Sequence, residues 1–436
     1  MAEKITIVGA GVSGRALALF AARSGAEVFV TDSRAELPES TQNDFKAASV
    51  RWECGGHTPR CCECDLMVVS SGVPETSPAV VMARDKKIPV QGELDFLAPF
   101  LHGKLIAVTG TNGKTTCTSL IAHILKENGI DAVACGNIGE PLAAHAGEDH
   151  EALVMELSSF QLHWNTRFAP DVAVLTNLAP DHIDWHGSYE NYVDDKCKIF
   201  LPPKDGGFAV VHQEDAFRVP EVRRTVVLGS GADRIELADK ESSLLLGEQK
   251  RVLFRTAALP LIGTHNQENA AMSAAAAVLA FPQIDVEKAL PSFKAPRHRC
   301  EKVCEKNGVF YVDDSKGTNV AAAVTALRSV PGRKTVILGG QGKGETYELL
   351  AQTVKEQATA AIVIGSEAPA ICRALEFAGC ENILRAAGME EAVRLAAKNA
   401  RPGETVLLSP ACTSWDMYKN YGERGDHFAQ LVRKLP

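Results

Sequence analysis

Residues 108–116 read VTGTNGKTT and join an apolar, β-rich stretch at Leu105–Thr109 to an amphipathic stretch at Thr115–Asn128. Backbone N–H groups of a glycine loop at a helix N-terminus form a cradle for anions. The usual first glycine of the G-x-x-x-x-G-K-[ST] pattern is replaced by Val108. Because a strand precedes the G-K-T-T run and a helix follows it, the segment predicts an ATP-binding loop rather than an ordinary strand-to-helix turn.

The polar side chains of this loop have defined tasks in such a site. Lys114 reaches the β- and γ-phosphates of the nucleotide, and the Thr115 hydroxyl binds Mg²⁺. This ion needs further oxygen ligands. Glu156 directly follows the predicted strand Ala152–Met155 and therefore projects at the same sheet edge, just ahead of the polar run at 158–161. A glutamate at a strand end is more often a surface charge, but its place here makes it a candidate ligand.

A second polar segment follows another predicted strand, Asp171–Leu175. It contains four ligand-type side chains within six residues: Asp181, His182, Asp184 and His186. Carboxylates and imidazoles at that density suit a divalent cation. A solvated polar loop explains the same residues equally well, so both interpretations stay open at this point. Lys196 lies after this segment on a predicted helix.

The N-terminal segment has the pattern of a dinucleotide-binding unit. The run GAGVSG at 9–14 lies between an apolar strand at Ile5–Val8 and a helix at Arg15–Arg23. A second strand at Glu27–Thr31 is followed by Asp32, where a ribose-binding acid is expected. Taken alone, these residues favour a nicotinamide or flavin site.

The C-terminal third alternates strand and helix patterns. The predicted strands are Val309–Val312, Thr335–Leu338, Ala361–Ile364 and Thr405–Leu408. Two polar loops, 313–319 and 409–414, each follow one of these strands and offer hydroxyls, carboxylates and a lysine to a charged small molecule. Cys412 lies in the second loop. No base or cation to activate its thiol can be placed from the sequence, so packing is the expected role.

Length and composition predict a globular chain of about three domains. We place these at residues 1–92, 93–295 and 296–436, each an α/β unit because strands alternate with helices. Hydrophobic residues make up 45% and charged residues 23% of the 436 residues. The net charge is −8 and no long basic run occurs, which excludes sequence-independent binding to nucleic acid.

No targeting or membrane segment is visible. The apolar stretch Ala270–Phe281 is well short of the roughly 18 residues of a spanning helix, so we expect a cytoplasmic protein. Twelve dispersed cysteines indicate reduced thiols. The run CGGHTPRCCEC at 54–64 has residue types that suit zinc, but it lacks the paired C-x₂-C spacing of structural sites. It favours a cysteine-rich surface loop.

Together these motifs resemble the Mur ligase family over essentially the whole chain. The matching segments are GAGVSG at 9–14, GTNGKTT at 110–116, GNIG at 136–139, ELSSFQL at 156–162, DHID at 181–184, Lys196, HNQEN at 265–269, HR at 298–299, DDSKGTN at 313–319 and SPACTSWDMYKNYGERG at 409–425. Their order and spacing are more specific than any one of them. The G-x-G-x-x-G start combined with ELSSFQL resembles the D-glutamate-adding branch.

The resemblance implies a fold and a reaction. The first domain would be Rossmann-like and hold the UDP of a UDP-sugar, which replaces the nicotinamide interpretation. The central domain would be a P-loop ATPase-like parallel sheet, and the third would be Rossmann-like and bind D-glutamate. The expected activity is an ATP-dependent amide ligase that adds D-glutamate to UDP-N-acetylmuramoyl-L-alanine through an acyl phosphate. It would release ADP and phosphate in the cytoplasmic steps of peptidoglycan synthesis.

The resemblance also implies site residues. The UDP-substrate would contact Gly11, Val12, Ser13, Asp32, Arg34, Gly72, Asn137, Ser158 and Gln161. ATP would contact Gly110, Thr111, Asn112, Gly113, Lys114, Thr115, Thr116, Asn266, Asn269, Arg299 and Asp314. D-Glutamate would contact Lys316, Thr318, Lys343, Ser414 and Tyr421. Two Mg²⁺ ions are implied, one bound by Thr115 and Glu156, the other by His182 and an N-carbamylated Lys196. Lys114, His182 and Lys196 would be the catalytic residues.

The sequence departs from the family pattern at a few positions. Thr413 stands where alanine is usual and Tyr421 where phenylalanine is common, and DHIDWHGS is richer in histidine than expected. These departures affect the expected contacts to D-glutamate rather than the reaction.

Three other interpretations remain to be weighed. A sibling ligase would use another amino acid, although the D-N-P-R run of one sibling type is absent. A nicotinamide-dependent oxidoreductase would rest on GAGVSG alone and leave GTNGKTT unexplained. A nucleotide-regulated binding protein would not need the combined metal, lysine and substrate loops. We expect a monomer whose three domains close on one reaction.

Overall fold

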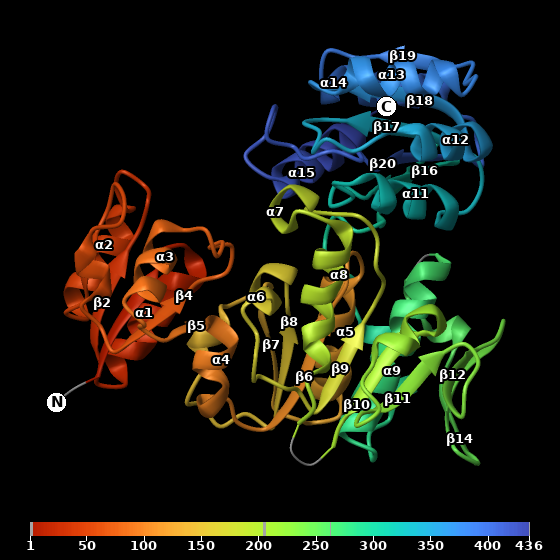
Figure 1. The fold of residues 1–436 in the computed structure, drawn as a ribbon. Helices are drawn as coiled ribbons and strands as arrows, with labels where there is room; N and C mark the ends of the chain where they lie inside the picture. The colour runs from red at the N-terminus through yellow and green to blue at the C-terminus, as the bar shows by residue number, and fades with distance from the viewer. Residues whose placement is uncertain (1–2, 204–205, 262, 436) are drawn as a thin grey trace. The chain divides into compact units, whose positions relative to one another are not determined.

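The computed structural model describes residues 3–203, 206–261 and 263–435, which form three β-sheets with helices packed beside them (Figure 1). Contacts within the chain define two compact units. The first unit comprises Met1–Ala258 and Ala270–Pro291 and contains the first and second sheets. The second unit comprises Leu259–Asn269 and Ser292–Pro436 and contains the third sheet.

The first sheet has the strand order β3-β2-β1-β4-β5, and every neighbouring pair is parallel. Its strands are β1 Lys4–Val8, β2 Glu27–Thr31, β3 Arg51–Glu53, β4 Leu66–Val69 and β5 Val90–Gly92. Its helices are α1 Val12–Arg23, α2 Glu39–Ala47 and α3 Pro78–Asp85. The chain order reverses direction beside β1, so the glycine turn after β1 opens at the edge where ligands of doubly wound sheets bind.

The second sheet has nine strands in the order β14-β13-β12-β11-β10-β9-β6-β8-β7. They are β6 Lys104–Thr109, β7 Ala132–Gly136, β8 Ala152–Glu156, β9 Val172–Leu175, β10 Phe208–His212, β11 Arg224–Leu228, β12 Asp233–Leu237, β13 Glu241–Leu246 and β14 Gln249–Arg255. Its helices are α4 Glu93–Leu97, α5 Lys114–Glu127, α6 Ser159–His163, α7 Ile183–His186, α8 Tyr189–Cys197, α9 Thr264–Ala280 and α10 Val286–Ala289, the first residues of α9 belonging to the second unit.

The strands from β7 to β12 run parallel, whereas β13 pairs antiparallel with both β12 and β14. The central sheet is therefore mixed, which corrects the expectation of a wholly parallel one. The core strands β6, β8 and β9 are almost completely buried. Their carboxyl ends lie at one edge of the sheet, and the loops that follow them carry the chemistry-bearing residues.

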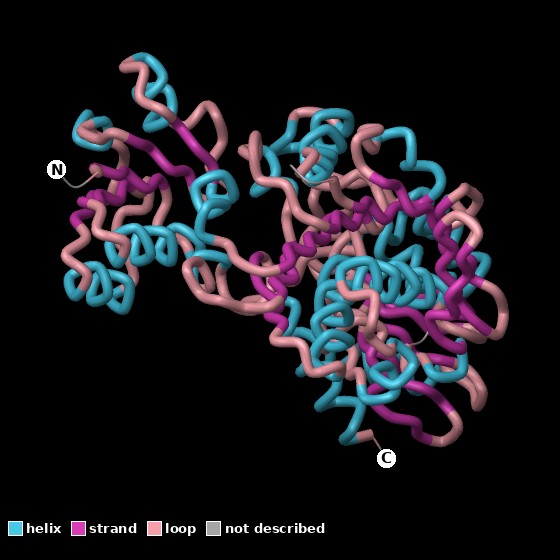
Figure 2. Tube along the Cα trace, turned by 90° about the horizontal axis from the view of Figure 1, so that it is seen from below, coloured by secondary structure: helices cyan, strands magenta, loops and turns pink. Residues whose placement is uncertain are grey.

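The third sheet has the order β15-β16-β20-β17-β18-β19, with only the β15–β16 pair antiparallel among the strands described. Its strands are β15 Glu301–Lys306, β16 Val309–Asp313, β17 Lys334–Gly339, β18 Ala358–Ile364, β19 Ile383–Arg385 and β20 Thr405–Leu408. Its helices are α11 Val320–Ser329, α12 Glu348–Gln357, α13 Ala368–Phe377, α14 Met389–Asn399 and α15 Tyr421–Lys434. Figure 2 marks the helices and strands of all three sheets along the chain trace.

The predicted α/β fold with three sheets is confirmed, and each sheet lies within one of the three segments predicted as domains. Two edge strands of the third sheet were not predicted, and neither were the edge strands β3, β5 and β7 of the other sheets. The strand β15 has the sequence EKVCEK, whose charged residues hide an apolar pattern, and β19 is only three residues long. Among the described helices, none combines the length and apolar character needed to cross a membrane.

The cysteine-rich run at 54–64 differs from the predicted surface loop. Cys61 and Cys62 are buried in a short 3₁₀ helix, Pro59–Cys62, where they pack against Val69 and other apolar side chains of the first sheet. Burial raises the pKa of the Cys61 thiol to about 12. Three groups of side chains in the described ranges could bring ligand atoms around one ion, and no cysteine belongs to them.

One buried carboxylate fixes the segment that leads from the first sheet into the second. Asp95 of α4 accepts hydrogen bonds from the backbone N–H groups of Thr166, Arg167 and Phe168 and from the Thr166 hydroxyl. These groups lie in the turn after α6. Because buried N–H groups are costly to leave without an acceptor, Asp95 stabilises this turn and the start of the second sheet together.

We expect Asp95→Ala to lower the free energy of unfolding by about 3 kcal/mol, because three backbone donors lose a charged acceptor. The measurement is thermal unfolding followed by circular dichroism, and the melting temperature should fall by several degrees. The control is Asp85→Ala, an exposed carboxylate at the end of α3, for which a change within about 0.5 kcal/mol is expected. Equal melting temperatures for the two variants would contradict the assignment.

Candidate functional site

The loop after β6 has the conformation of an anion cradle. Gly110 has φ 139° and Gly113 has φ 84°, both in the region that favours glycine. A Cβ atom on Gly110 would lie 2.0 Å from Oγ1 of Thr176, so this position has no room for a side chain. Gly113 precedes the first residue of α5 and turns the loop into the helix. The first backbone N–H groups of a helix point out of its N-terminus, which is the arrangement that binds phosphate oxygens.

Residues from the end of β9 brace the loop from behind. The Asn112 backbone N–H donates to Oδ1 of Asn177 at 3.0 Å, and the Asn177 amide donates back to the Asn112 carbonyl at 3.0 Å. Thr111 exchanges a hydrogen bond of 2.9 Å with the Tyr192 hydroxyl of α8. The loop is thus held from two elements, so its shape does not depend on a bound nucleotide.

Two lysines meet at one carbonyl of the loop. Lys114 donates to the carbonyl oxygens of Gly110 and Thr111, both at 2.8 Å, and Lys196 donates to the Gly110 carbonyl at 2.8 Å. Lys196 is 2% exposed and its ammonium lies 4.7 Å from the ring centroid of Tyr192. Burial, with a further contribution from the charge of Lys114, holds the pKa of Lys196 well below its ordinary value. The site therefore favours a neutral amine at Lys196.

Glu156 has an unusual environment for a carboxylate. It is the last residue of β8 and pairs in register with Val108 of β6, beside the phosphate loop. One oxygen, Oε1, accepts a hydrogen bond of 3.1 Å from the Asn137 amide. The other, Oε2, is buried and has no hydrogen-bond partner among the described residues. A buried carboxylate oxygen without a donor fits a metal ligand, because a cation would offset its desolvation.

The segment 181–186 is divided by the structure. His182 lies at the start of α7 with φ 52°, and its side chain is 39% exposed with the ring edge against Phe160. His186 is buried instead, where its Nδ1 lies 2.8 Å from Asp195 and its Nε2 lies 3.0 Å from the Ser159 hydroxyl. His186 therefore holds α6, α7 and α8 together, and the four ligand-type residues do not form one cluster.

The glycine turn after β1 is tightly packed except where a ligand would approach. A Cβ atom on Gly9 would lie 2.4 Å from the Ser70 hydroxyl, and one on Gly14 would lie 1.9 Å from the Gly9 carbonyl. A Cβ atom on Gly11 or on Gly72 would meet nothing within 4 Å. Gly9 and Gly14 are thus needed for the close packing of the turn, whereas the backbone at Gly11 and Gly72 has free space beside it.

Asp32 orders this turn from β2. It accepts from the Ala10 backbone N–H at 2.6 Å and from the backbone and guanidinium of Arg34. Burial alone would raise the pKa of the Asp32 carboxyl, but the hydrogen bonds from Arg34 and Ala10 lower it to about 2. The acid predicted to contact a ligand is thus already engaged, and it holds Arg34 at the rim of the turn.

Ser158 and Gln161 form a capping box at the start of α6. The Ser158 hydroxyl accepts from the Gln161 backbone N–H, and Oε1 of Gln161 accepts from the Ser158 backbone N–H. The Gln161 amide also donates to Glu93 at 3.5 Å. Burial raises the pKa of Glu93 to about 7. The sequence analysis did not single out Glu93, because nothing in the sequence shows that this glutamate at the start of α4 is buried.

The second unit brings together the loops that follow β16, β17 and β20. The ammonium of Lys316 lies 4.0 Å from the ring centroid of Tyr421, which places two residues of the predicted amino-acid site side by side. Asp314 accepts from the Ser409 hydroxyl at 2.7 Å, and burial raises its pKa to about 7. Both polar loops predicted from the sequence therefore meet at one edge of the third sheet.

The predicted ATP contacts are divided between the two compact units. The phosphate loop at 110–116 belongs to the first unit, whereas Asn266, Asn269, Arg299 and Asp314 belong to the second. Cys412 is fully buried with its Sγ 3.5 Å from the Tyr347 hydroxyl, and burial raises the pKa of the Cys412 thiol to about 11. A protonated buried thiol agrees with packing and not with a nucleophile.

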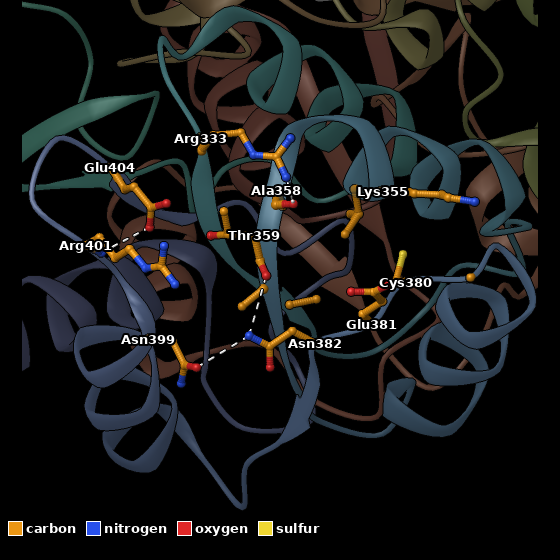
Figure 3. A pocket seen from close by; sticks show the side chains of 14 residues that line it. Arg333, Lys355, Ala358, Thr359, Cys380, Glu381, Asn382, Asn399, Arg401 and Glu404 are labelled. Carbon is orange, nitrogen blue, oxygen red and sulfur yellow. Dashed lines mark hydrogen bonds between the residues drawn. The ribbon is translucent and has the colours of Figure 1, made fainter.

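A cavity of about 550 Å³ in the second unit is separate from these loops (Figure 3). Its polar lining includes Arg333, Thr359, Asn382 and Glu404. These residues lie at the beginnings of β17, β18, β19 and β20, whereas the predicted site residues follow the ends of strands. None of the predicted site residues lines this cavity.

Models of three protein domains match the chain in sequence order. They are described as the Mur ligase MurD-like N-terminal domain over residues 3–92, the Mur ligase middle domain over residues 108–277, and the Mur ligase glutamate ligase domain over residues 298–412. The chain belongs to the Mur ligase family. This assignment overturns the nicotinamide interpretation of GAGVSG, because the segment is part of the matched Mur ligase N-terminal domain.

Curated relatives match the chain from end to end. The UDP-N-acetylmuramoylalanine–D-glutamate ligase of Pelotomaculum thermopropionicum is 41% identical and covers 99% of this chain and 98% of its own length. The protein of the same name from Christiangramia forsetii is 34% identical and covers 100% of both. The similarity to these relatives therefore extends over the whole chain and is not limited to a single domain.

Solved structures share the fold at lower identity. The UDP-N-acetylmuramate-alanine ligase MurC of Thermotoga maritima superposes with a TM-score of 0.60 at 20% identity, covering 99% of each chain. The MurF ligase of Thermotoga maritima, solved in complex with ADP, has a TM-score of 0.62 at 20% identity and covers 93% of this chain and 94% of its own. These similarities confirm the three-domain Mur ligase fold.

We expect Lys114→Ala to lower ATP turnover by at least about 100-fold, because the ammonium that neutralises phosphate oxygens is lost. The measurement is the steady-state release of ADP by the purified chain. The control is Lys126→Ala on the same helix, whose side chain is exposed, and this variant should keep its activity. Retained turnover in Lys114→Ala would exclude the loop as the phosphate site.

Proposed function

We propose that this chain joins D-glutamate to UDP-N-acetylmuramoyl-L-alanine with the conversion of ATP to ADP and phosphate, in the cytoplasmic steps of peptidoglycan synthesis. The observation that carries the proposal is the end-to-end match to relatives named for this reaction, at 41% and 38% identity. The MurD-like N-terminal domain at residues 3–92 supports this member of the family over its siblings.

The first step is transfer of the γ-phosphoryl group to the alanyl carboxylate of the UDP-substrate. The carboxylate oxygen attacks phosphorus, the bond to the β-phosphate oxygen breaks, and ADP leaves with that electron pair. The backbone N–H groups at the start of α5 would hold the phosphates, and Lys114 would neutralise the charge on the transferred group. Its hydrogen bonds to the carbonyls of Gly110 and Thr111 support this role, since they hold its ammonium at the phosphate loop.

Glu156, Thr115, His182 and a carbamylated Lys196 would hold Mg²⁺ in this site. The unpartnered Oε2 of Glu156 supports the fit, and Asn137 holds the same carboxylate in place through its other oxygen. Bound Mg²⁺ would supply charge neutralisation for the phosphoryl oxygens. Glu156 is the last residue of β8 and Asn137 directly follows the neighbouring strand β7, so the sheet fixes their positions.

The second step is attack of the D-glutamate amine on the acyl phosphate carbon. A tetrahedral intermediate collapses, the bond from carbon to the phosphate oxygen breaks, and phosphate leaves as the amide forms. The amine must be neutral to attack, and it loses a proton as the amide forms. We assign D-glutamate to Lys316, Thr318, Lys343, Ser414 and Tyr421. The pairing of Lys316 with the Tyr421 ring supports a site for a charged small molecule.

The first sheet would bind the UDP-substrate. The open backbone at Gly11 and Gly72 and the guanidinium of Arg34 are suited to a pyrophosphate and its ribose. Val12, at the start of α1, is 76% exposed, which is high for a valine and supports contact with a ligand.

The amino-acid substrate is tested by a panel of D-glutamate, L-alanine, L-lysine and meso-diaminopimelate, each added with ATP and UDP-N-acetylmuramoyl-L-alanine. We expect ADP release to depend on D-glutamate alone, because the chain belongs with the D-glutamate-adding relatives. The product is checked by mass spectrometry for an added glutamyl residue. Release driven by another amino acid would assign the chain to a sibling activity, and no release with any would contradict ligase function.

The environment of Lys196 supports the proposal that it is carbamylated. A neutral amine adds to carbon dioxide and releases one proton, which leaves an anionic carbamate on Nζ. Burial and the neighbouring Lys114 favour the neutral amine, and the carbamate would face Lys114 as an opposite charge. An ammonium at Lys196 would instead be repelled by Lys114 and by a nearby cation.

We expect Lys196→Ala to lose most of the ligase activity and to regain part of it in millimolar acetate or propionate, because a small carboxylate can occupy the vacated space. The matched control is Lys196→Met, which fills that space with an apolar side chain. This variant should stay inactive in the same acids. Activity of Lys196→Ala without added acid, or equal behaviour of both variants, would contradict the carbamate.

A further inference from the structure

Arg424 is a fully buried cation that the proposed reaction does not use. It lies in the first turn of α15 and has an exposure of 0%. Its Nε donates to the Ser315 hydroxyl at 2.9 Å, and its Nη2 donates to the Ser315 carbonyl at 2.7 Å. Its Nη1 donates to the carbonyls of Cys412 and Thr413, both at 3.1 Å. One guanidinium therefore ties together three segments that are distant in sequence.

These segments carry the residues assigned to D-glutamate. Ser315 immediately precedes Lys316, and its hydroxyl donates to the carbonyl of Tyr421 at 2.8 Å. Thr413 immediately precedes Ser414. A fourth segment, which holds Lys343, has no direct hydrogen bond to Arg424 among the described contacts and is connected to it through Thr413.

Thr413 links this fourth segment to Arg424 through hydrogen bonds with Gln341. Its backbone N–H donates to the Gln341 carbonyl at 2.9 Å, and the Gln341 N–H donates to the Thr413 carbonyl at 3.0 Å. The Thr413 hydroxyl also donates to the Gln341 carbonyl at 2.9 Å. Since Gln341 is two residues before Lys343, all the loops of the amino-acid site are connected to Arg424 directly or through Thr413.

Two glycines leave room for this arrangement. A Cβ atom on Gly340, which has φ 139°, would lie 2.1 Å from the Thr413 carbonyl and 3.2 Å from Nη1 of Arg424. A Cβ atom on Gly425 would lie 2.2 Å from Nδ1 of His298. Glycine therefore stands at both positions where a side chain would collide: Gly340 beside Thr413 and Arg424, and Gly425 beside His298.

A fully buried arginine needs an explanation, because moving its charge out of water costs free energy of folding. Burial lowers the pKa of Arg424 to about 10, so the group keeps its charge at neutral pH. Replacing buried charges by apolar side chains of similar volume is often neutral or stabilising. A planar group with five donors in a fixed fork can hold several carbonyls in one relative geometry, which an apolar side chain or a lysine cannot do.

We propose that Arg424 is a positioning residue for the amino-acid substrate: it sets the relative placement of the loops carrying Lys316, Lys343, Ser414 and Tyr421, and thereby the affinity for a dicarboxylic amino acid. The inference rests on the proposed function, because it concerns the same half of the reaction. Arg424 acts through the loops and does not touch the substrate.

The test compares the KM values of the three substrates in Arg424→Lys and Arg424→Ala. We expect KM for D-glutamate to rise by at least about tenfold, with KM for ATP and for the UDP-substrate within about twofold, because the hydrogen bonds of Arg424 go to Ser315, Cys412 and Thr413 and not to Asp314 or the phosphate loop. Turnover at saturating D-glutamate should fall much less. Millimolar guanidinium should lower KM for D-glutamate in Arg424→Ala, and ammonium should not.

Arg433→Ala, an exposed arginine on the same helix, is the matched control and should leave every constant unchanged. If Arg424→Ala does not fold, Arg424→Lys and Ser315→Ala provide the same comparison, because each removes part of the fork contact. A parallel rise of all three KM values, or a loss of turnover alone, would overturn the inference. A wild-type chain that uses a different amino acid refutes the proposed function, and the KM comparison is then made with that amino acid.

Discussion

The meeting of Lys114 and Lys196 at the Gly110 carbonyl is the interaction on which the rest of the first unit depends. Two ammonium groups at one oxygen repel each other, and burial together with the charge of Lys114 holds the pKa of Lys196 well below its ordinary value. The loop geometry that exposes this carbonyl requires glycine at 110, where a Cβ atom has no space. The phosphate loop, the lowered pKa of Lys196 and the surroundings of Glu156 therefore all depend on the short segment that follows β6.

The parallel sheets explain why so many polar residues gather there. Strands β6, β8 and β9 end at one edge, so the loops beginning at Gly110, Leu157 and Thr176 are neighbours although they are tens of residues apart. Hydrogen bonds from Thr176, Asn177 and Tyr192 then hold the phosphate loop. The second unit repeats the principle with β16, β17 and β20, and a buried guanidinium takes the bracing role.

The fold could be predicted wherever a strand was buried and continuous in the sequence. Strands such as β6 and β17 have uninterrupted apolar residues, and glycine turns follow them. Strand β15 was missed because an edge strand with lysine and glutamate has no such run. Cys61 and Cys62 were misplaced at the surface because a short polar-looking segment can be covered by neighbouring elements that are remote in the chain.

The sequence by itself determined the Mur ligase resemblance, the order of the motifs and the strand ends that carry them, because glycine requirements and apolar patterns are local properties of the chain. Only the tertiary structure decided that His186 is a buried partner of Asp195 rather than a fourth ligand, that one oxygen of Glu156 has no donor, and that Arg424 joins the amino-acid loops. These properties depend on contacts across 9 to 109 residues. Packing sets such contacts, and no spacing rule along the sequence specifies them.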